Sequence, residues 1–191
     1  MDYSAFESVN RWSAHNGWSH AFFRTYATLG IGVFAVGLIL AGLIGLRSDP
    51  LVLARSLWAG AAAVLALALN QPIADAVGRA RPFATHRGVL VLVDKSIDPG
   101  FMSDHSIVAG AVAVGLVFAV RRIGWLMVGA AILLAFTRVF VGAHYPSDVI
   151  AGSAFGGAIA AAGIPLADRF LAPWCQRLRT TSIASRFVAP S

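Results

Sequence analysis

Charged side chains are scarce in this sequence. Only 13% of the 191 residues are Asp, Glu, Lys or Arg, whereas 58% are hydrophobic. A soluble globular domain carries about 25% charged and about 45–50% apolar residues. The deficit argues against a soluble domain and favours a protein that is embedded in a membrane.

Cysteine is nearly absent, because Cys175 is the only one. One cysteine excludes an internal disulfide and a CxxC metal site. The first twenty residues also lack an early basic region followed by an apolar run, which would mark a cleaved signal peptide. The spacing of Phe6, Val9 and Trp12 instead predicts an amphipathic N-terminal segment over residues 1–22 that lies in the membrane interface, with a disordered leader as the alternative.

The sequence contains several long apolar runs. Because about 20 apolar residues are needed to cross about 30 Å of hydrocarbon, we expect about five transmembrane helices. The apolar tracts cover residues 25–46, 56–74, 105–120, 123–141 and 149–167. The predicted fold class is therefore all-α, a polytopic transmembrane helical bundle that forms one domain over residues 1–191 and ends in a basic cytoplasmic tail at 173–191.

Acidic residues are fewer than basic ones, 9 against 15, and the net charge is +6. Such an excess is typical of nucleic-acid binding, but most of the arginines lie at the ends of alternate apolar tracts. They are Arg47, Arg55, Arg121, Arg122, Arg169, Arg177, Arg179 and Arg186. With five spans these positions share one side of the membrane, and an excess of Lys and Arg marks the cytoplasmic side. We therefore expect no nucleic-acid partner, and we expect the N-terminus and residues 71–104 to face outward.

A second set of polar residues falls at the outward ends of the predicted spans. Arg138 lies inside an apolar run, where ionisable residues are costly and usually functional, although snorkelling to the headgroups is an alternative. Pro146 suits the first position of a helix. Asp148 would then lie in the first turn, where it can accept the Nδ1 proton of His144 and leave Nε2 as a nucleophile. An aspartate cap beside an incidental histidine is the competing interpretation.

Two further clusters lie on the same side. Ser103 suits the N-cap of the next helix, whose free N–H groups attract anions, and His105 in its first turn is placed to act as a general acid. A capping box beside an interfacial histidine explains these residues equally well. Arg79 and Arg81 follow the second tract and either bind phosphate or contact lipid headgroups. Together the three clusters predict a phosphate site.

These clusters resemble the three-part signature of the type 2 phosphatidic acid phosphatase superfamily, Lys-x6-Arg-Pro, Pro-Ser-Gly-His and Ser-Arg-x5-His-x3-Asp. The sequence keeps Arg81-Pro82 from the first part, with Ala74 at the lysine position. Residues 102–105 match the second part as Met-Ser-Asp-His, and residues 137–148 match the third with Thr137 in place of serine. The Ser-Asp-His and Arg-Pro-Phe strings are similar to the bacterial BcrC-type undecaprenyl-diphosphatase branch.

The resemblance implies a multi-pass bacterial inner-membrane hydrolase with its site on the periplasmic side. Its substrate would be an undecaprenyl-type diphosphate carrier lipid, which connects it to peptidoglycan and cell wall biogenesis and to bacitracin resistance. His144 would form a phosphohistidine with Asp148 holding its ring, and His105 would serve as acid and then base. The residues expected around the substrate phosphate are Arg81, Arg138, Ser103, Arg79, Asp104 and Thr137. The resemblance implies no metal and no cofactor.

Several points stay open on the sequence alone. The replacement for the missing lysine is one of Arg79, Arg87 and Lys95, and His86 has no assigned role. Phosphatidic acid or phosphatidylglycerophosphate is an alternative substrate, because the site recognises a terminal phosphate. A transporter of anionic lipids is a weaker alternative, since no internal repeat is found. The prenyl chain length and the oligomeric state, a homo-oligomer included, are also undetermined.

Overall fold

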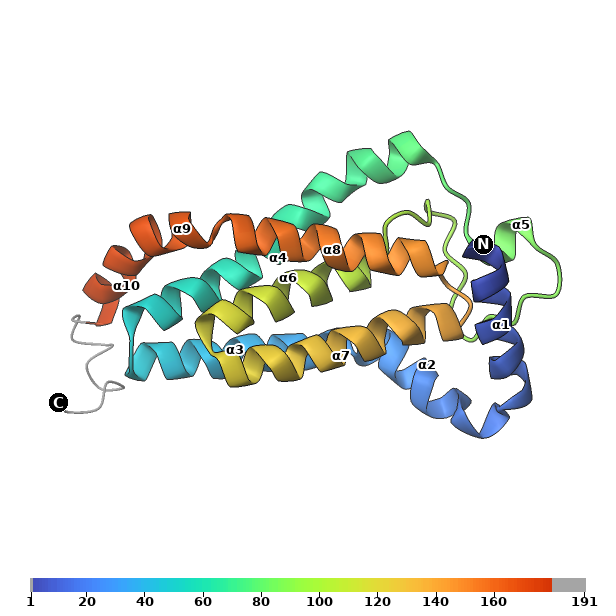
Figure 1. Ribbon diagram of the computed structural model, residues 1–191, viewed down its shortest axis with the longest axis horizontal. Coiled ribbons are helices and arrows are strands. Elements are labelled where there is room, and N and C mark those ends of the chain that lie inside the picture. The colour runs from blue at the N-terminus through green and yellow to red at the C-terminus, as the bar shows by residue number, and fades with distance from the viewer. Residues whose placement is uncertain (1, 180–191) are drawn as a thin grey trace.

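The structure, a computed structural model, describes residues 2–179, and this range contains only helices and the turns between them (Figure 1). The helices are α1 Asp2–His15, η1 Gly17–Ser19, α2 His20–Leu29, α3 Ile31–Arg47, α4 Pro50–Val77, α5 Pro82–Thr85, α6 Asp104–Ala119, α7 Arg121–Phe140, α8 Pro146–Ala162, α9 Ile164–Leu166, the π-helix η2 Ala167–Leu171 and α10 Ala172–Arg179. Residues 180–191, with Arg186 and most of the predicted basic tail, lie outside the described residues.

The predicted all-α membrane bundle is confirmed, and each apolar tract coincides with a helix or a helix pair. Three helical stretches are long and apolar enough to span a membrane: Pro50–Thr85, Arg121–Phe140 and Pro146–Arg179. The stretches Gly17–Leu29 and Ile31–Arg47 pass the same test as a pair bent by 52°. The helix α6 is apolar but shorter, with 16 residues. The count of five spans therefore stays a prediction.

The short helix α6 lies at the centre of the bundle. It packs against α3, α4, α7 and α8, and Figure 1 shows it between α4 and α8 on one side and α3 and α7 on the other. No residue between Ser106 and Leu116 is fully exposed. Because protein surrounds this helix along most of its length, it does not have to match the hydrocarbon thickness in the way that a lipid-facing helix does.

Local sequence features end one helix and start another at the same end of the bundle. Gly78 ends α4 with a φ of +58°, a left-handed conformation that glycine adopts without strain. Pro146 opens α8, where its missing N–H is not needed. This end, where α4 and α7 finish and α6 and α8 begin, is called the site end below. The end where α3 finishes and α7 begins is called the opposite end.

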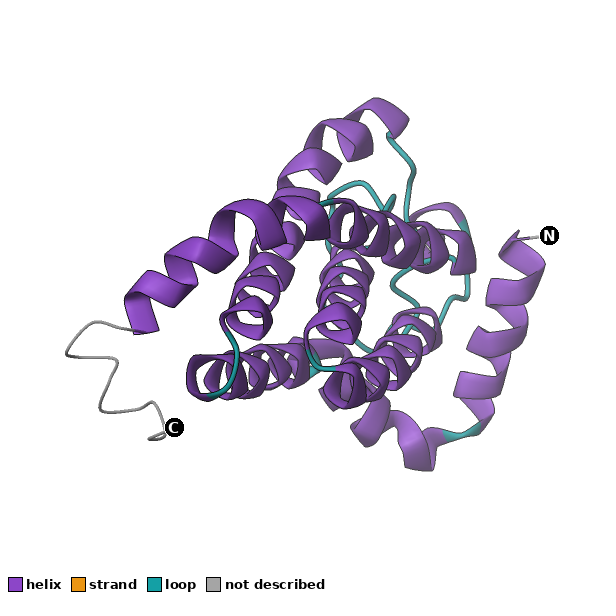
Figure 2. Ribbon diagram, turned by 60° about the vertical axis from the view of Figure 1, so that its left-hand side comes forward, coloured by secondary structure: helices purple, strands orange, loops and turns teal. Residues whose placement is uncertain are grey.

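The predicted N-terminal interfacial segment forms α1, which stands beside the loops of the site end (Figure 2). It is more than a surface helix, because Phe6 is buried and the side chain of Asn10 is tied to a distant loop. Asn10 donates to the carbonyl of Leu90 at 2.8 Å, and its oxygen accepts from the Leu90 N–H at 3.0 Å. Trp12 and Trp18 stay exposed on the same segment. The interfacial location itself stays a prediction.

An ion pair at the opposite end connects three elements. Arg55 of α4 donates to both carboxylate oxygens of Asp168 at 2.8 Å each, and its third nitrogen donates to the carbonyl of Phe118 at 2.9 Å. Residues 173–179 of the predicted tail are helical, and Cys175 is buried among Leu53 and other apolar side chains. This part of the tail therefore packs against the bundle.

Glycines allow α6 and α8 to pack closely. A Cβ atom on Gly156 would lie 2.1 Å from the carbonyl oxygen of Ile107, and one on Gly110 would lie 2.2 Å from the carbonyl oxygen of Ser153. Real Cβ atoms do not approach backbone atoms so closely, so a side chain at either position would push the two helices apart.

We expect Gly156→Ala to destabilise the protein by about 1–3 kcal/mol, because the added methyl group overpacks against the backbone of α6. Gly42→Ala on α3 is the matched control, since a Cβ there meets no atom within 4 Å. It should leave stability unchanged or raise it slightly, because alanine favours a helix more than glycine does. Thermal unfolding in detergent can be followed by a thiol-reactive dye, which labels the buried Cys175 only as the protein opens. Equal midpoints for the two variants would contradict the packing argument.

Candidate active site

A cavity of about 300 Å³ opens at the site end. Its deeper wall carries two arginines and two histidines, contributed by the segment after α4, by α6, by α7 and by the loop before α8: Arg81, His105, Arg138 and His144. Four exposed carboxylates line its mouth: Asp75, Asp94, Asp98 and Asp104. The positive groups are therefore the deeper ones, so an anionic group is stabilised inside and not at the rim.

His144 lies in the loop between α7 and α8 and is buried, with 3% of its surface exposed. Its Nδ1–H donates to the carbonyl of Gly100 at 2.9 Å, since a carbonyl oxygen can only accept. Nε2 therefore carries the lone pair, and it accepts from Nη1 of Arg81 at 3.1 Å. This is the tautomer that a nucleophilic imidazole requires, and His144 is one of the residues that line the cavity.

The partner of Nδ1 differs from the expected one. The sequence predicts that Asp148 accepts the Nδ1 proton, but its nearest oxygen is 3.9 Å away, too far for a hydrogen bond. That oxygen accepts from the backbone N–H of Tyr145 at 2.9 Å and so caps the start of α8. Gly100 carries no side-chain signal, so sequence reasoning had no means of finding this partner. Asp148 remains near the ring but does not hold it directly.

The electrostatic surroundings keep His144 neutral. Burial lowers the pKa of His144 well below its ordinary value, and the positive charges of Arg138 and Arg81 lower it further. Burial also lowers the pKa of Arg81, while Asp98 and other nearby carboxylates partly offset the effect. A neutral imidazole that faces two guanidinium groups can attack an electrophile that carries negative charge, because the cations stabilise that charge.

Arg138 has unused hydrogen-bonding capacity beside the cavity. Its side chain is buried, Nη1 donates to the carbonyl of Ala27 at 3.2 Å, and Nε has no partner. Within residues 2–179, four buried side-chain polar atoms lack a partner, and Arg138 Nε is the one that belongs to a residue lining the cavity. Arg138 therefore brings a positive charge and a side chain with unused donors to the cavity lining, where an anion would be attracted to it.

His105 also lines the cavity, from the first turn of α6. No hydrogen bond involves its ring within the described part of the chain, so it is available for proton transfer. Beside it Asp104 accepts from Nδ2 of Asn70 at 2.9 Å. Asn70 is buried, and it also exchanges hydrogen bonds of 3.4 Å with the backbone of Met102. Sequence reasoning did not assign Asn70 to the site, although a polar residue in an apolar run was an available signal.

Three residues expected around the phosphate do not line the cavity. Ser103 is fully buried, and its hydroxyl has no hydrogen bond. Thr137 donates back to the carbonyl of Leu133 at 2.7 Å within its own helix. Arg79 donates to Asp148 at 2.7 Å and to Asp2, outside the cavity wall. Of the six residues expected around the phosphate, Arg81, Arg138 and Asp104 line the cavity.

The candidate replacements for the missing lysine are also absent from the cavity wall. Ala74, at the lysine position, lines the cavity, whereas Arg79, Arg87 and Lys95 do not. Lys95 has only an indirect connection to the cavity: its ammonium lies 5.8 Å from the ring centre of Phe83, and Phe83 lines the cavity. His86 stacks on Tyr3 of α1 with ring centres 3.7 Å apart, which is a packing role.

The carboxylates and the two histidines that line this cavity do not form a metal-binding cluster. Between residues 2 and 179 no group of three or more His, Cys, Asp or Glu side chains is arranged to hold a metal ion. The donors that do converge are guanidinium groups, which match phosphate oxygens in shape and charge. The fold and the site define a membrane-embedded phosphatase.

The chain belongs to the PAP2 superfamily, whose family model matches residues 55–171. This confirms the family expected from the motifs. The chain is 31% identical over 150 residues to the undecaprenyl-diphosphatase BcrC of Bacillus subtilis (strain 168), covering 78% of this chain and 76% of that protein. It is 47% identical over 88 residues to the lipid A 1-phosphatase of Rhizobium etli, covering 43% of this chain and 37% of that protein.

A solved structure has the same fold. The transmembrane PAP2 type phosphatidylglycerolphosphate phosphatase from Bacillus subtilis aligns with a TM-score of 0.65 and 21% sequence identity, covering 88% of this chain and 87% of that chain. At this identity the likeness concerns the fold alone.

We expect inorganic phosphate to stabilise the protein against heat, and Arg138→Lys to weaken phosphate binding by about 10–100-fold. Lysine lacks the Nε–H and the planar donor fork, and a hydrogen bond to a charged group is worth about 1.5–3 kcal/mol. The measurement is the thermal midpoint as a function of phosphate concentration. Arg122→Lys at the opposite end is the matched control, because Arg122 is exposed and remote from the cavity. Equal phosphate affinity in both variants would exclude Arg138 from the anion site.

Proposed function

We propose that this phosphatase hydrolyses the terminal phosphate of a polyprenyl diphosphate carrier lipid of the undecaprenyl type, through a phosphohistidine on His144. The observation that carries the proposal is the His144 ring, which lines the cavity together with Arg138 and whose Nε2 accepts from Arg81. The similarity to an undecaprenyl-diphosphatase over most of both chains favours this substrate class. Such an activity would recycle the carrier lipid of cell wall synthesis and oppose bacitracin.

The proposed reaction has two steps. In the first step Nε2 of His144 attacks the terminal phosphorus, a P–N bond forms, and the P–O bond to the polyprenyl phosphate breaks while His105 gives its proton to the leaving oxygen. In the second step water attacks the phosphorus, its proton returns to His105, and the P–N bond breaks to release inorganic phosphate. Arg81 and Arg138 stabilise the charge on the phosphoryl oxygens in both steps.

A lipid phosphomonoester is the second candidate substrate. The lipid A 1-phosphatase similarity and the fold of the phosphatidylglycerolphosphate phosphatase both favour it. The terminal phosphate is the same in both substrate classes, and the same cavity would accept it. The leaving group distinguishes them, because a polyprenyl phosphate leaves more readily than an alkoxide.

We expect purified protein in detergent to release phosphate faster from farnesyl diphosphate than from phosphatidic acid, and His144→Ala to release none from either. Excess EDTA should leave the rate nearly unchanged, because the proposed steps use arginines and histidines only. A preference for phosphatidic acid would move the assignment to the monoester class. Binding of both lipids without phosphate release would favour the transporter alternative.

The two histidines should respond differently to the leaving group. Loss of a general acid typically costs about 10²–10⁴-fold, and it costs less when the leaving group needs little protonation. His105→Ala should therefore lose less activity on p-nitrophenyl phosphate than on an alkyl phosphate, whereas His144→Ala should be inactive on both. Acid-quench trapping of a ³²P-labelled intermediate tests the assignment directly. A phosphoryl group found on His105 would show that the two roles are reversed.

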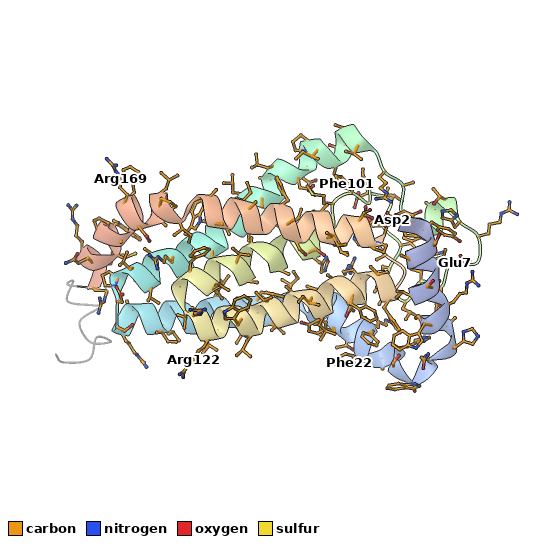
Figure 3. All side chains as sticks on the ribbon, in the orientation of Figure 1. Asp2, Glu7, Phe22, Phe101, Arg122 and Arg169 are labelled. Carbon is orange, nitrogen blue, oxygen red and sulfur yellow. The ribbon has the colours of Figure 1, made fainter. Side chains whose placement is uncertain are left out.

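We also propose five spans, with the site end facing the periplasm and the opposite end facing the cytoplasm of a bacterial inner membrane. Arg122 and Arg169 lie toward the opposite end, away from Asp2 and Phe101 at the site end (Figure 3), and Arg47 ends α3 there too. This distribution supports a cytoplasmic opposite end, because Lys and Arg accumulate on that side.

Cysteine accessibility tests this topology. In a Cys175→Ser background, Arg122→Cys should react with a membrane-impermeant maleimide only after the cells are lysed. Trp18→Cys on the site-end segment should react in intact cells with a permeable outer membrane. Labelling of position 122 from outside would reverse the proposed orientation.

A further inference from the structure

Arg79 lies at the site end but does not line the cavity. Its Nη1 donates to Oδ1 of Asp148 at 2.7 Å and to Oγ of Ser147 at 2.6 Å, and its Nη2 donates to Asp2. The guanidinium lies 4.3 Å from the ring centre of Tyr145. Both terminal nitrogens of Arg79 therefore donate to protein oxygens, and the guanidinium is held in this position by its protein partners.

Asp148 depends on this arginine. Its carboxylate is fully buried, and among the described residues its one other hydrogen bond is from the Tyr145 N–H, with the His144 ring 3.9 Å away. A buried carboxylate without an ionic partner is strongly disfavoured, and it either takes up a proton or turns away. Arg79 is therefore the ionic partner of Asp148, and it holds the orientation of this carboxylate beside the imidazole.

The N-terminal helix holds Arg79 from its other side. Asp2 shares the guanidinium with Asp148, and it also accepts from the N–H of Ser147 at 3.1 Å and from its hydroxyl at 2.6 Å. The helix α1 is anchored to the same loops by the stack of Tyr3 on His86, at 3.7 Å between ring centres, and by the packing of Phe6 against Tyr145. Asp2 is thus placed by a packed helix rather than by a free chain end.

We propose that Arg79 and Asp2 are positioning residues, which act through Asp148 on His144. Because Asp2 belongs to α1, this helix then contributes to catalysis. Neither side chain lines the cavity, and neither is expected to touch the substrate. The inference rests on the proposed function in one respect, since it takes His144 as the nucleophile. It assigns Arg79 to the carboxylate and not to the phosphate.

A double-mutant cycle tests this assignment. Arg79→Ala should lower kcat by about 10–100-fold and leave KM within about 3-fold, because the residue orients a reacting group and does not bind substrate. In an Asp148→Asn background the same change should cost less than about 2-fold, because the group through which Arg79 acts is already neutral. Arg138→Lys, which faces the cavity, should raise KM and should cost the same factor with and without Asp148→Asn.

Two variants of α1 complete the experiment. Asp2→Asn should lower kcat by about 3–10-fold at unchanged KM, since it loosens Arg79 without removing it. Glu7→Gln is the matched control on the same helix, because Glu7 pairs only with Arg11 at 2.7 Å, and it should have no effect. Thermal midpoints are measured for every variant, and rates are normalised to the folded fraction.

Three outcomes would overturn the proposal. A raised KM at normal kcat for Arg79→Ala would make it a phosphate ligand. Full additivity with Asp148→Asn would show that it does not act through that carboxylate. A kcat loss that disappears after normalisation to folded protein would leave only a structural role. The cycle is measured on both farnesyl diphosphate and phosphatidic acid, so a wrong substrate assignment changes which lipid is hydrolysed and leaves the coupling between Arg79 and Asp148 measurable.

Discussion

The close packing of α6 against α8 is the contact on which the site depends. Both helices begin at the site end, and Gly110, Gly152 and Gly156 allow their backbones to touch. The N–H of Ser103 donates to the carbonyl of Asp148 at 3.2 Å, which joins the first turns of the two helices. His105, which opens one helix, and His144, which precedes the other, face one cavity because these two helix ends cannot separate.

A second constraint is the cost of unpaired polar groups in a protein that lies largely in hydrocarbon. Around His144 nearly every such group is paired within the protein: its Nδ1 with Gly100, Asp148 with Arg79 and the backbone, and Arg81 with two backbone carbonyls and the imidazole. Arg138 Nε is left without an acceptor at the cavity. These hydrogen bonds hold the groups around His144 in place before a substrate binds, and such preorganisation stabilises a phosphoryl transition state.

The charge pattern of the cavity is consistent with a lipid phosphate. Its carboxylates are exposed at the mouth, whereas the arginines and His144 lie deeper. The electrostatic stabilisation of an anion is therefore weaker beside the carboxylates at the mouth than beside the arginines, so a phosphate group should bind close to His144. Four motif residues that this chain retains, Arg81, His105, Arg138 and His144, line the cavity, and Ala74, which stands at the lysine position, lines it without a charge.

The sequence by itself determined the helices and the chemical class of the site. Apolar runs of about 20 residues predict spans because hydrocarbon thickness sets their length. The short spacing from His144 to Asp148 keeps the two residues near each other, with 3.9 Å between Nδ1 and the nearest carboxylate oxygen. Tertiary structure alone decided which groups actually pair. Gly100 is the partner of His144 across 44 positions, and Asp2 meets Ser147 across 145 positions. Neither pairing leaves a pattern in the sequence, because it follows from how loops and helices pack and not from local spacing. For the same reason Arg79, which was expected near the phosphate because it lies close to Arg81 in the sequence, pairs with two carboxylates instead.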